Sequence, residues 1–441
     1  MNVAVNFEQN PQMRVIEAPA APRNIAETGL DEGFLVDLLC KVMYRQGLER
    51  ATEIARAMCL PVPIIDELLE LSKQSKLVET LGQLGASMRA EMRWSLSGKG
   101  REWALDALGQ SEYNGPAPVT IQQFTEQVRR QSVRTERLTE EMLHSVFKDL
   151  TLSKEMMEDI GPAVNSYSAV LLYGPPGNGK SSISNAVCAA FRDHIYIPHA
   201  IVVERAIIVL YDPTVHTAIR TGGEGSEGSV LRRDAGVDRR YVPCKRPALT
   251  TGGELTLDML DLSYNPTSRV YEAPMQLKAS GGIFVVDDFG RQRQTPQELM
   301  NRLIIPLEAG VDYLSLQTGR KFQLPFDTLV MFSTNIAPSK LVDDAALRRL
   351  RYKILVDSPD REAFLKILAH TARKFGLELS EQVVHYILFE LYEKTPGAKF
   401  QGFHPRFLCD QIMAMCIYKG VKPQFTPEFL DRAWRNLFYK D

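Results

Sequence analysis

The segment Gly174-Pro-Pro-Gly-Asn-Gly-Lys-Ser181 decides the fold, because it fits the pattern G-x-x-x-x-G-K-[ST] at every position. An apolar run over residues 170–173 precedes it, and a helical run over residues 182–191 follows it. The glycines let the backbone curl so that successive N–H groups face phosphate oxygens, and the N-terminus of the following helix adds its positive dipole end. The sequence therefore predicts a phosphate-binding loop between a strand and a helix.

The residues of this loop have expected parts in holding ATP and Mg²⁺. Lys180 would reach the β- and γ-phosphates, and the Ser181 hydroxyl would ligate Mg²⁺. An ordinary Gly/Pro loop is the alternative, but it would not account for strand, motif and helix in register. The candidate nucleotide-binding residues are Gly174, Pro175, Pro176, Gly177, Asn178, Gly179, Lys180, Ser181 and Ser182.

A second apolar run ends in a pair of aspartates, in the segment Gly281-Gly-Ile-Phe-Val-Val-Asp-Asp-Phe289. Its four-residue apolar core suits a buried parallel strand, and ligands bind at the carboxyl ends of such strands in open α/β sheets. We expect Asp287 to hold Mg²⁺ through its water shell and Asp288 to polarise the attacking water. A solvated strand end is the alternative, because a hydrophobic run before aspartate is a weak motif alone.

Three further segments follow in order: Leu329-Val-Met-Phe-Ser-Thr-Asn335, Leu341-Val-Asp-Asp-Ala-Ala-Leu-Arg-Arg-Leu-Arg351 and Gly402-Phe-His-Pro-Arg-Phe-Leu408. Together with the loop and the aspartate pair, they make residues 121–441 resemble the AAA+ ATPases. The resemblance implies that Asn335 orients water or touches the γ-phosphate, and that Arg406 reaches the phosphates from a helical lid. It also implies an arginine finger offered to the neighbouring subunit, for which Arg349 aligns best and Arg348 and Arg351 are close alternatives.

The resemblance extends to a hairpin and to one departure from the family pattern. Residues 312–324 alternate around a central Thr-Gly, which predicts a β-hairpin, and this resembles the pre-sensor-1 hairpin group, in which the hairpin often lines the pore of a ring. Most AAA+ proteins have Glu where Asp288 stands, and the shorter aspartate leaves ATP binding intact but the rate of hydrolysis open. The segments GGELTLDML and DDFGRQ resemble segments of little-characterised bacterial winged-helix ATPases.

The N-terminal part resembles a winged-helix module, with helices from residue 31, over 51–58 and over 64–73, strands over 76–80 and 91–96, and a helix over 100–108. Such modules often read DNA with the third helix. Residues 31–110 hold ten Lys and Arg against twelve Asp and Glu, and phosphate binding needs a basic face. We therefore expect this module to dock a protein, with nucleic acid as the less favoured partner.

The expected organisation is a flexible segment over 1–28, a winged-helix-like domain over 29–110, a linker over 111–120, a nucleotide-binding domain over 121–356 and a lid over 357–441. The predicted fold class is an α/β P-loop NTPase of the AAA+ type with a parallel sheet, a C-terminal α-helical lid and an N-terminal winged-helix α+β domain. We expect an insert at about 212–280, preceded by strands over 196–203 and 206–211. Its arginine-rich stretch over 221–246 is either a partner-contacting element or a mobile solvated loop.

Composition excludes several classes of protein. The net charge is −2, so no global charge favours nucleic acid or an anionic membrane, and no apolar stretch is long enough to span a bilayer. The six cysteines form no CxxC pair and the N-terminus lacks a signal-peptide pattern, so we expect a cytoplasmic protein. His404 is expected to be a capping or surface histidine.

These interpretations combine into one predicted function with two alternatives. The chain is expected to bind and hydrolyse ATP with Mg²⁺ at the subunit interfaces of a homo-oligomeric ring, a hexamer in most such proteins. The ring would remodel a protein partner in the manner of a chaperone. The alternatives are a DNA-associated motor or regulator and an ATP-switched scaffold with little turnover.

Overall fold

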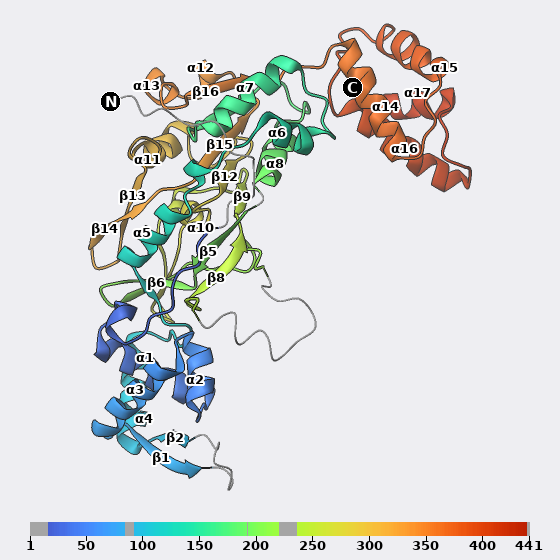
Figure 1. The fold of residues 1–441 in the computed structure, drawn as a ribbon. Helices are drawn as coiled ribbons and strands as arrows, with labels where there is room; N and C mark the ends of the chain where they lie inside the picture. The colour runs from blue at the N-terminus through green and yellow to red at the C-terminus, as the bar shows by residue number, and fades with distance from the viewer. Residues whose placement is uncertain (1–15, 84–91, 192, 220–235, 439–441) are drawn as a thin grey trace.

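The computed structural model describes residues 16–83, 92–191, 193–219 and 236–438 of the chain. Its centre is a parallel sheet with the strand order β16–β4–β15–β12–β9 (Figure 1). Runs rich in Val, Ile, Leu and Phe favour strands that are buried on both faces. The strands are β4 (Val170–Tyr173), β9 (Ala248–Thr251), β12 (Ile283–Val286), β15 (Leu329–Thr334) and β16 (Tyr352–Leu355).

Helices cover both faces of the parallel sheet, because alternate residues of a strand point to opposite sides. Val170 and Leu172 pack in one core with α6, α7 and α8, whereas Leu171 packs in another with α11 and α13. This arrangement confirms the α/β part of the predicted fold class. We name residues 119–356 the α/β unit, and its helices are α5 (Ile121–Arg130), η2 (Val133–Thr135), α6 (Glu140–Phe147), α7 (Lys154–Asn165), α8 (Lys180–Ala190), η3 (Leu257–Leu260), α10 (Met275–Lys278), α11 (Pro296–Ala309), α12 (Pro338–Leu341) and α13 (Asp344–Leu347).

A second, mixed sheet belongs to the same unit and has the order β10–β11–β7–β6–β3. Two antiparallel strand pairs, β5–β8 and β13–β14, complete the α/β unit. The pair β13–β14 is the hairpin predicted over residues 312–324. The strands of the second sheet and of these pairs are β3 (Val119–Thr120), β6 (Ala200–Val203), β7 (Ala206–Val209), β10 (Ser263–Asn265), β11 (Val270–Glu272), β5 (His194–Pro198), β8 (Tyr241–Lys245), β13 (Val311–Ser315) and β14 (Lys321–Pro325).

Two expectations about residues 196–280 are wrong. The strand predicted over 196–203 is two strands, β5 and β6, which pair with different partners. The two strands are separated by His199, whose N–H donates to the Arg240 carbonyl (3.0 Å). The insert predicted at about 212–280 contains β9, which pairs with β12 in the central sheet, so only part of that segment is an addition to the sheet.

The N-terminal unit, residues 32–110, has the order of helices and strands that the sequence predicts. Asp31 accepts the Phe34 N–H and Ser97 accepts the Gly100 N–H, so α1 and α4 begin after capping residues. β1 and β2 form an antiparallel pair, and the loop between them, residues 84–91, lies outside the described residues. The elements are α1 (Glu32–Gln46), α2 (Ala51–Met58), α3 (Val62–Gln74), β1 (Val78–Gln83), β2 (Met92–Leu96) and α4 (Gly98–Gln110).

The segment over residues 111–120 joins the N-terminal unit to the α/β unit through buried contacts. Ala117 and Val119 are buried, and the Ala117 N–H donates to the Met58 carbonyl (2.8 Å). Val202 of β6 and Ile207 of β7 lie in the same hydrophobic core as α1, α2 and α3. The N-terminal unit is therefore packed directly onto the second sheet.

The residues before α1 are also packed. Ile16 is buried, Ala20 forms a β-bridge with Val237, and the short helix η1 (Ala26–Thr28) precedes α1. The predicted flexibility of residues 1–28 is therefore wrong for residues 16–28. Residues 1–15 lie outside the described residues.

One alternative predicted for residues 221–246 was a mobile solvated loop. This prediction is wrong for the last part of the segment, which contains Arg240 and Arg246. Arg240 is buried against Asp238 (Nη2–Oδ2 2.8 Å) and donates to the Thr28 carbonyl (3.0 Å). Arg246 is buried against Asp193 (Nε–Oδ1 2.6 Å). Buried charges need such partners, so loss of either aspartate would leave an uncompensated charge inside the protein. Residues 220–235 lie outside the described residues.

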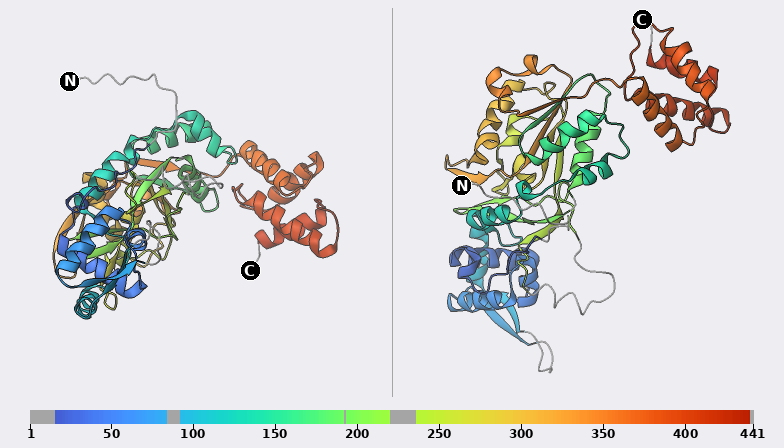
Figure 2. Two further views of the ribbon diagram at one scale, coloured as in Figure 1. Left: turned by 60° about the horizontal axis from the view of Figure 1, so that its bottom comes forward. Right: turned by 45° about the horizontal axis from the view of Figure 1, so that its top comes forward.

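The lid, residues 361–437, is a helical unit with a hydrophobic core of its own, which includes Phe364, Leu408 and Trp434. Figure 2 shows the lid and the N-terminal unit at opposite ends of the α/β unit. None of the helices in the described residues is long and apolar enough to cross a bilayer. The helices of the lid are α14 (Arg361–Lys374), α15 (Glu381–His385), the π-helix η4 (Tyr386–Tyr392), α16 (His404–Lys419) and α17 (Pro427–Leu437).

The expectation that His404 is a capping or surface residue is wrong. Only 3% of its surface is exposed, and its Nδ1 lies 2.6 Å from the Tyr392 hydroxyl. Burial lowers the pKa of His404 to about 4. His404 is therefore a neutral member of the lid core.

Candidate functional site

The site lies where three parallel strands end at the same edge of the central sheet. β15 lies between β4 and β12, and both pairings are parallel and in register. The loop after β4, Asp287 after β12 and Asn335 after β15 therefore meet in one place. Ligands of α/β proteins bind at such carboxyl ends.

The loop from β4 to α8 depends on its glycines. Gly174 has φ +143°, and a Cβ there would overlap the Val356 carbonyl. Gly179 has φ +91° and forms the N-cap of α8, which begins at Lys180. Glycine adopts these conformations without strain. The loop thus leads to a helix N-terminus, where backbone N–H groups lack partners within the helix and suit an anion.

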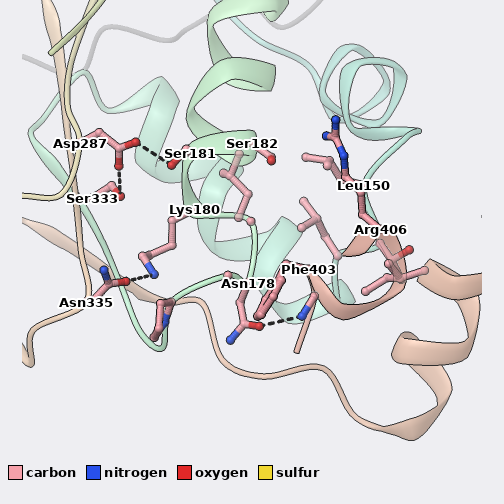
Figure 3. Close-up of a pocket in the computed structure, with 18 of the residues that line it drawn as sticks. Leu150, Asn178, Lys180, Ser181, Ser182, Asp287, Ser333, Asn335, Phe403 and Arg406 are labelled. Atoms are coloured by element: carbon pink, nitrogen blue, oxygen red, sulfur yellow. Dashed lines mark hydrogen bonds between the residues drawn. The ribbon is translucent and has the colours of Figure 1, made fainter. Parts of the chain in front are cut away.

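Lys180 is a buried cation of the site, with 6% of its surface exposed. Its Nζ donates to the carbonyls of Gly174 (3.0 Å) and Pro175 (2.8 Å) and to Asn335 Oδ1 (2.7 Å) (Figure 3). Burial lowers the pKa of Lys180, and the two nearby aspartates oppose that shift. A charged amine that is largely removed from water attracts an anion such as phosphate more strongly than an exposed one does.

Asp287 and Ser181, which the sequence predicts to hold Mg²⁺, lie side by side. The Ser181 hydroxyl donates to Asp287 Oδ2 (2.7 Å), and the Ser333 hydroxyl donates to Oδ1 (2.6 Å) (Figure 3). Oxygen ligands suit Mg²⁺, which usually keeps several waters and binds substrate phosphates. The described residues contain no group of three or more His, Cys, Asp or Glu side chains suited to a metal. The residues that would hold Mg²⁺ here are Ser181 and Asp287.

Asp288 is held in an unusual conformation beside this pair. Its φ is +48°, a left-handed conformation that few residues other than glycine adopt. Its Oδ1 accepts a hydrogen bond from Asn335 Nδ2 (3.2 Å). Gln292, which is 9% exposed, accepts the Gly290 N–H (2.8 Å) and donates to the Gly252 carbonyl (3.0 Å). The turn that carries Asp288 is therefore fixed on both sides, and such conformations cluster at functional sites.

A cavity of about 610 Å³ lies between the α/β unit and the lid and brings most of the predicted residues together. This volume falls within the range of about 300–1,000 Å³ that is typical of small-molecule sites. The α/β unit lines it with residues 149–152 and 176–183 and with Asp287, Asp288, Arg291, Ser333 and Asn335. The lid lines it with Ile367, His370, Thr371, Gly402, Phe403 and Arg406.

Arg406 lines the cavity from the first turn of α16, in agreement with its predicted position on the lid. Its side chain is 79% exposed and pairs with Asp410 at 3.8 Å. On the wall formed by residues 149–152, Asp149 pairs with His370 and Lys374 of the lid, each at 3.5 Å. Exposed pairs of this kind contribute little to stability. Arg406 is therefore able to turn toward an anion at small cost.

The three arginines predicted as finger candidates do not line the cavity. Arg349 is held within its own chain, because its Nε pairs with Glu308 (2.8 Å) and its Nη1 donates to the Ala345 carbonyl (2.6 Å). Arg348 and Arg351 are exposed, and in the described part of the chain their side chains make no hydrogen bond or ion pair. One chain thus brings none of the three into its own cavity.

Several residues of the site were not predicted from the sequence. Ser333 and Asn335 are two positions apart at a strand end and so share a face, a signal that could have found Ser333. Arg291, three residues after Asp288, also lines the cavity. It belongs to the segment DDFGRQ, but no role was predicted for it. Gln292 was not predicted either; its side chain accepts the nearby Gly290 N–H and donates to the Gly252 carbonyl, 40 residues away.

Comparison with known proteins matches one family model to part of the chain and many solved structures to its fold. The family described as "Domain of unknown function (DUF8689)" matches residues 360–436, which form the lid. Among solved structures, NtrX from Brucella abortus has 12% sequence identity and a TM-score of 0.38, and the match covers 72% of this chain and 59% of that chain. The chain thus spans less than two thirds of that protein, and a TM-score this low supports no conclusion. No curated protein matches the chain.

Proposed function

We propose that the chain is an ATPase of the AAA+ type that binds ATP and Mg²⁺ in the cavity between the α/β unit and the lid. One observation carries the proposal: Lys180, the Ser181–Asp287 pair and the Asp288–Asn335 pair converge at one edge of the parallel sheet. A cation, a set of Mg²⁺ ligands and a group that orients water, all beside one glycine-rich loop, are what hydrolysis of a γ-phosphate requires.

Each group has a definite task in this proposal. The N–H groups of the loop and the Lys180 amine would hold the phosphates and oppose their charge. Mg²⁺, when bound, would neutralise charge on the β- and γ-phosphate oxygens. Asp288 would accept a hydrogen bond from the attacking water and take up its proton. Asn335 donates to Asp288 and would keep that carboxylate oriented.

The proposal includes a ring of identical subunits, a hexamer as in most AAA+ proteins, in which a neighbour supplies an arginine to each site. Arg348 and Arg351 are the better candidates, because they are exposed, whereas Arg349 is already paired with Glu308. An arginine supplied to a transferring phosphoryl group can raise the rate by about 10³- to 10⁵-fold.

The role proposed for the assembly is ATP-driven remodelling of a protein that docks on the N-terminal unit. The exposed face of α3 carries Asp66, Glu67 and Glu70 against one lysine, Lys73, which lies 3.9 Å from Glu70. Negative side chains repel the phosphates of nucleic acid and favour a partner with basic residues. This charge pattern supports the protein-directed role over the DNA-associated one.

A second candidate function is an ATP-dependent switch with little turnover. The observation in its favour is the length and restraint of Asp288, whose carboxylate is one methylene shorter than that of Glu and is hydrogen-bonded to Asn335. A carboxylate that is held back would orient water poorly. ATP binding would then control assembly without rapid hydrolysis.

Steady-state ATP turnover at several protein concentrations tests these proposals. We expect turnover per subunit to rise with concentration, because each site needs a neighbour. We expect Lys180→Ala and Asp288→Asn to lower turnover by about 100-fold or more, the loss typical of removing one group that stabilises the transition state. Lys154→Ala, a matched change at a lysine with a 91% exposed side chain, should leave turnover unchanged. Saturable ATP binding without turnover would support the switch, and no ATP binding would exclude both functions.

A further inference from the structure

The phosphate-binding loop and the lid contact each other directly. The Gly402 N–H, just before α16, donates to Asn178 Oδ1 (2.9 Å) (Figure 3). Asn178 Nδ2 donates to Ser358 Oγ (3.4 Å), in the segment that leads into the lid. One side chain of the loop thus bonds to both the entrance of the lid and the start of its helix α16. The loop motif leaves the residue at this position unspecified, so phosphate binding alone does not require asparagine.

An aromatic ring packs at the same place. A Cβ at Gly177 would overlap the Phe403 ring, and a Cβ at Gly402 would lie 3.2 Å from the Gly177 carbonyl. The two glycines therefore allow the loop and the lid to approach closely. Phe403 is still 39% exposed and lines the cavity, so its ring lies on the loop at the border of the expected phosphate site.

The lid side of this contact is connected to the lid core. His404 follows Phe403, and the two rings pack edge to face with centroids 4.6 Å apart. The buried His404 lies within hydrogen-bond distance of Tyr392, which belongs to the same core as Phe364. Because this core is closely packed, a shift of the loop would move the lid as one body.

We propose that Asn178, Ser358 and Phe403 form a latch that fastens the lid to the phosphate-binding loop and couples the position of the lid to the bound nucleotide. This inference rests on the nucleotide site proposed above and describes its regulation. Phosphates would bind the backbone N–H groups of the same loop, so nucleotide and lid act on one element. Coupling of this kind is reciprocal, so contacts made only from the lid must alter nucleotide affinity. Asn178 is a positioning residue that acts through the lid.

The latch is tested by two measurements on the full-length chain. One is backbone amide exchange at Gly402 with and without ATP, and the other is the affinity for a fluorescent ATP analogue. Ser358→Ala and Phe403→Ala are compared with Tyr418→Ala, which removes a ring that is 90% exposed at the other end of α16. We expect both latch variants to speed Gly402 exchange and to weaken nucleotide binding about five- to tenfold, a typical coupling between two sites. Tyr418→Ala should change neither quantity.

A double variant tests whether Ser358 acts through Asn178, as the latch requires. If it does, Asn178→Ala with Ser358→Ala should bind nucleotide as weakly as Asn178→Ala alone. Independent, additive losses would overturn the latch. So would nucleotide affinity and Gly402 exchange that match wild type in Ser358→Ala and Phe403→Ala, and in that case the nucleotide site itself would stand. A wild-type chain that binds no ATP would overturn the proposed function and the coupling together.

Discussion

At the scale of single residues, Asp288 sets the expected speed of the proposed site. Its carboxylate is restrained by Asn335 and stands on a left-handed backbone. Asp288→Glu would extend the carboxylate by one methylene toward the water it has to orient. We expect the kcat for ATP to rise about tenfold, which corresponds to about 1.4 kcal/mol of the barrier, with KM nearly unchanged. Steady-state kinetics on the wild type and the variant would measure both constants.

The control for this substitution is thermal stability. Asp tolerates a left-handed backbone better than Glu does, so the melting temperature must be compared before the rates are interpreted. If kcat falls while the melting temperature is unchanged, the expectation is wrong, and the shorter carboxylate of Asp288 is the one that fits the site.

At the scale of elements, the lid carries a buried neutral histidine. Burial lowers the pKa of His404 to about 4 from an ordinary value of 6.5. Between these two values the unfolded chain binds a proton that the folded lid does not. Lid stability should therefore fall as the pH decreases from 6.5 and level off below about 4. Thermal unfolding followed over this pH range measures the effect.

His404→Asn isolates this contribution, because asparagine keeps a polar atom near Tyr392 but does not titrate in this range. The variant should lose part of the pH dependence of unfolding. His144→Asn, at a histidine whose side chain is 60% exposed, serves as the matched control and should keep the wild-type dependence. An identical pH dependence in His404→Asn and wild type would contradict the assignment.

Elements whose signals are local were predictable, and those that depend on distant partners were not. The strand, loop and helix around Lys180 are encoded within about twenty residues, and the aspartates and Asn335 each follow their own apolar run. His404 was misassigned because its surroundings come from Tyr392 and other residues of the lid core. The start of a helix or the end of a strand is determined largely by neighbouring residues, whereas the burial of a side chain depends on the whole fold.

At the scale of the whole molecule, the proposed ring makes each site a product of two chains. Arg348→Ala and Arg351→Ala should show which of these two residues is the arginine finger. Loss of the finger should lower turnover by about 10³-fold or more, while ATP affinity stays near wild type. Arg349→Ala should instead leave turnover near wild type and change stability only slightly, because its partner Glu308 has a 53% exposed side chain. ATP turnover, nucleotide affinity and melting temperature together distinguish these outcomes.

Mixing two inactive variants tests whether the site is shared. Lys180→Ala chains keep their arginines, and chains that lack the finger keep an intact loop, so mixed rings contain some complete sites. We expect part of the turnover to return on mixing. If neither Arg348→Ala nor Arg351→Ala changes turnover, or if mixing restores none, the proposed supply of an arginine by a neighbour is wrong.

The architecture of the chain was less predictable than its parts. The segment over 111–120 has the composition of a linker, yet Ala117 and Val119 are buried in it. The basic residues Arg240 and Arg246 suggested a solvated stretch, yet each is buried against an aspartate. Ala117 contacts Met58 and Arg246 contacts Asp193, both remote in the sequence. Asp238 is close to Arg240 in the sequence, but Arg240 also donates to the remote Thr28 carbonyl. Composition alone does not reveal such remote partners.

The buried join at residues 111–120 has a mechanical consequence. Because the N-terminal unit shares a hydrophobic core with the second sheet, we expect it to rotate together with the α/β unit as one rigid body. The N-terminal unit lies at the end of the molecule opposite the lid (Figure 1). Any tilt of a subunit would therefore swing α3 and its acidic face through an arc that grows with distance from the pivot. In the proposed ring the N-terminal unit would act as a lever arm, so that a small angular change at the nucleotide would become a large displacement of a protein bound to this unit.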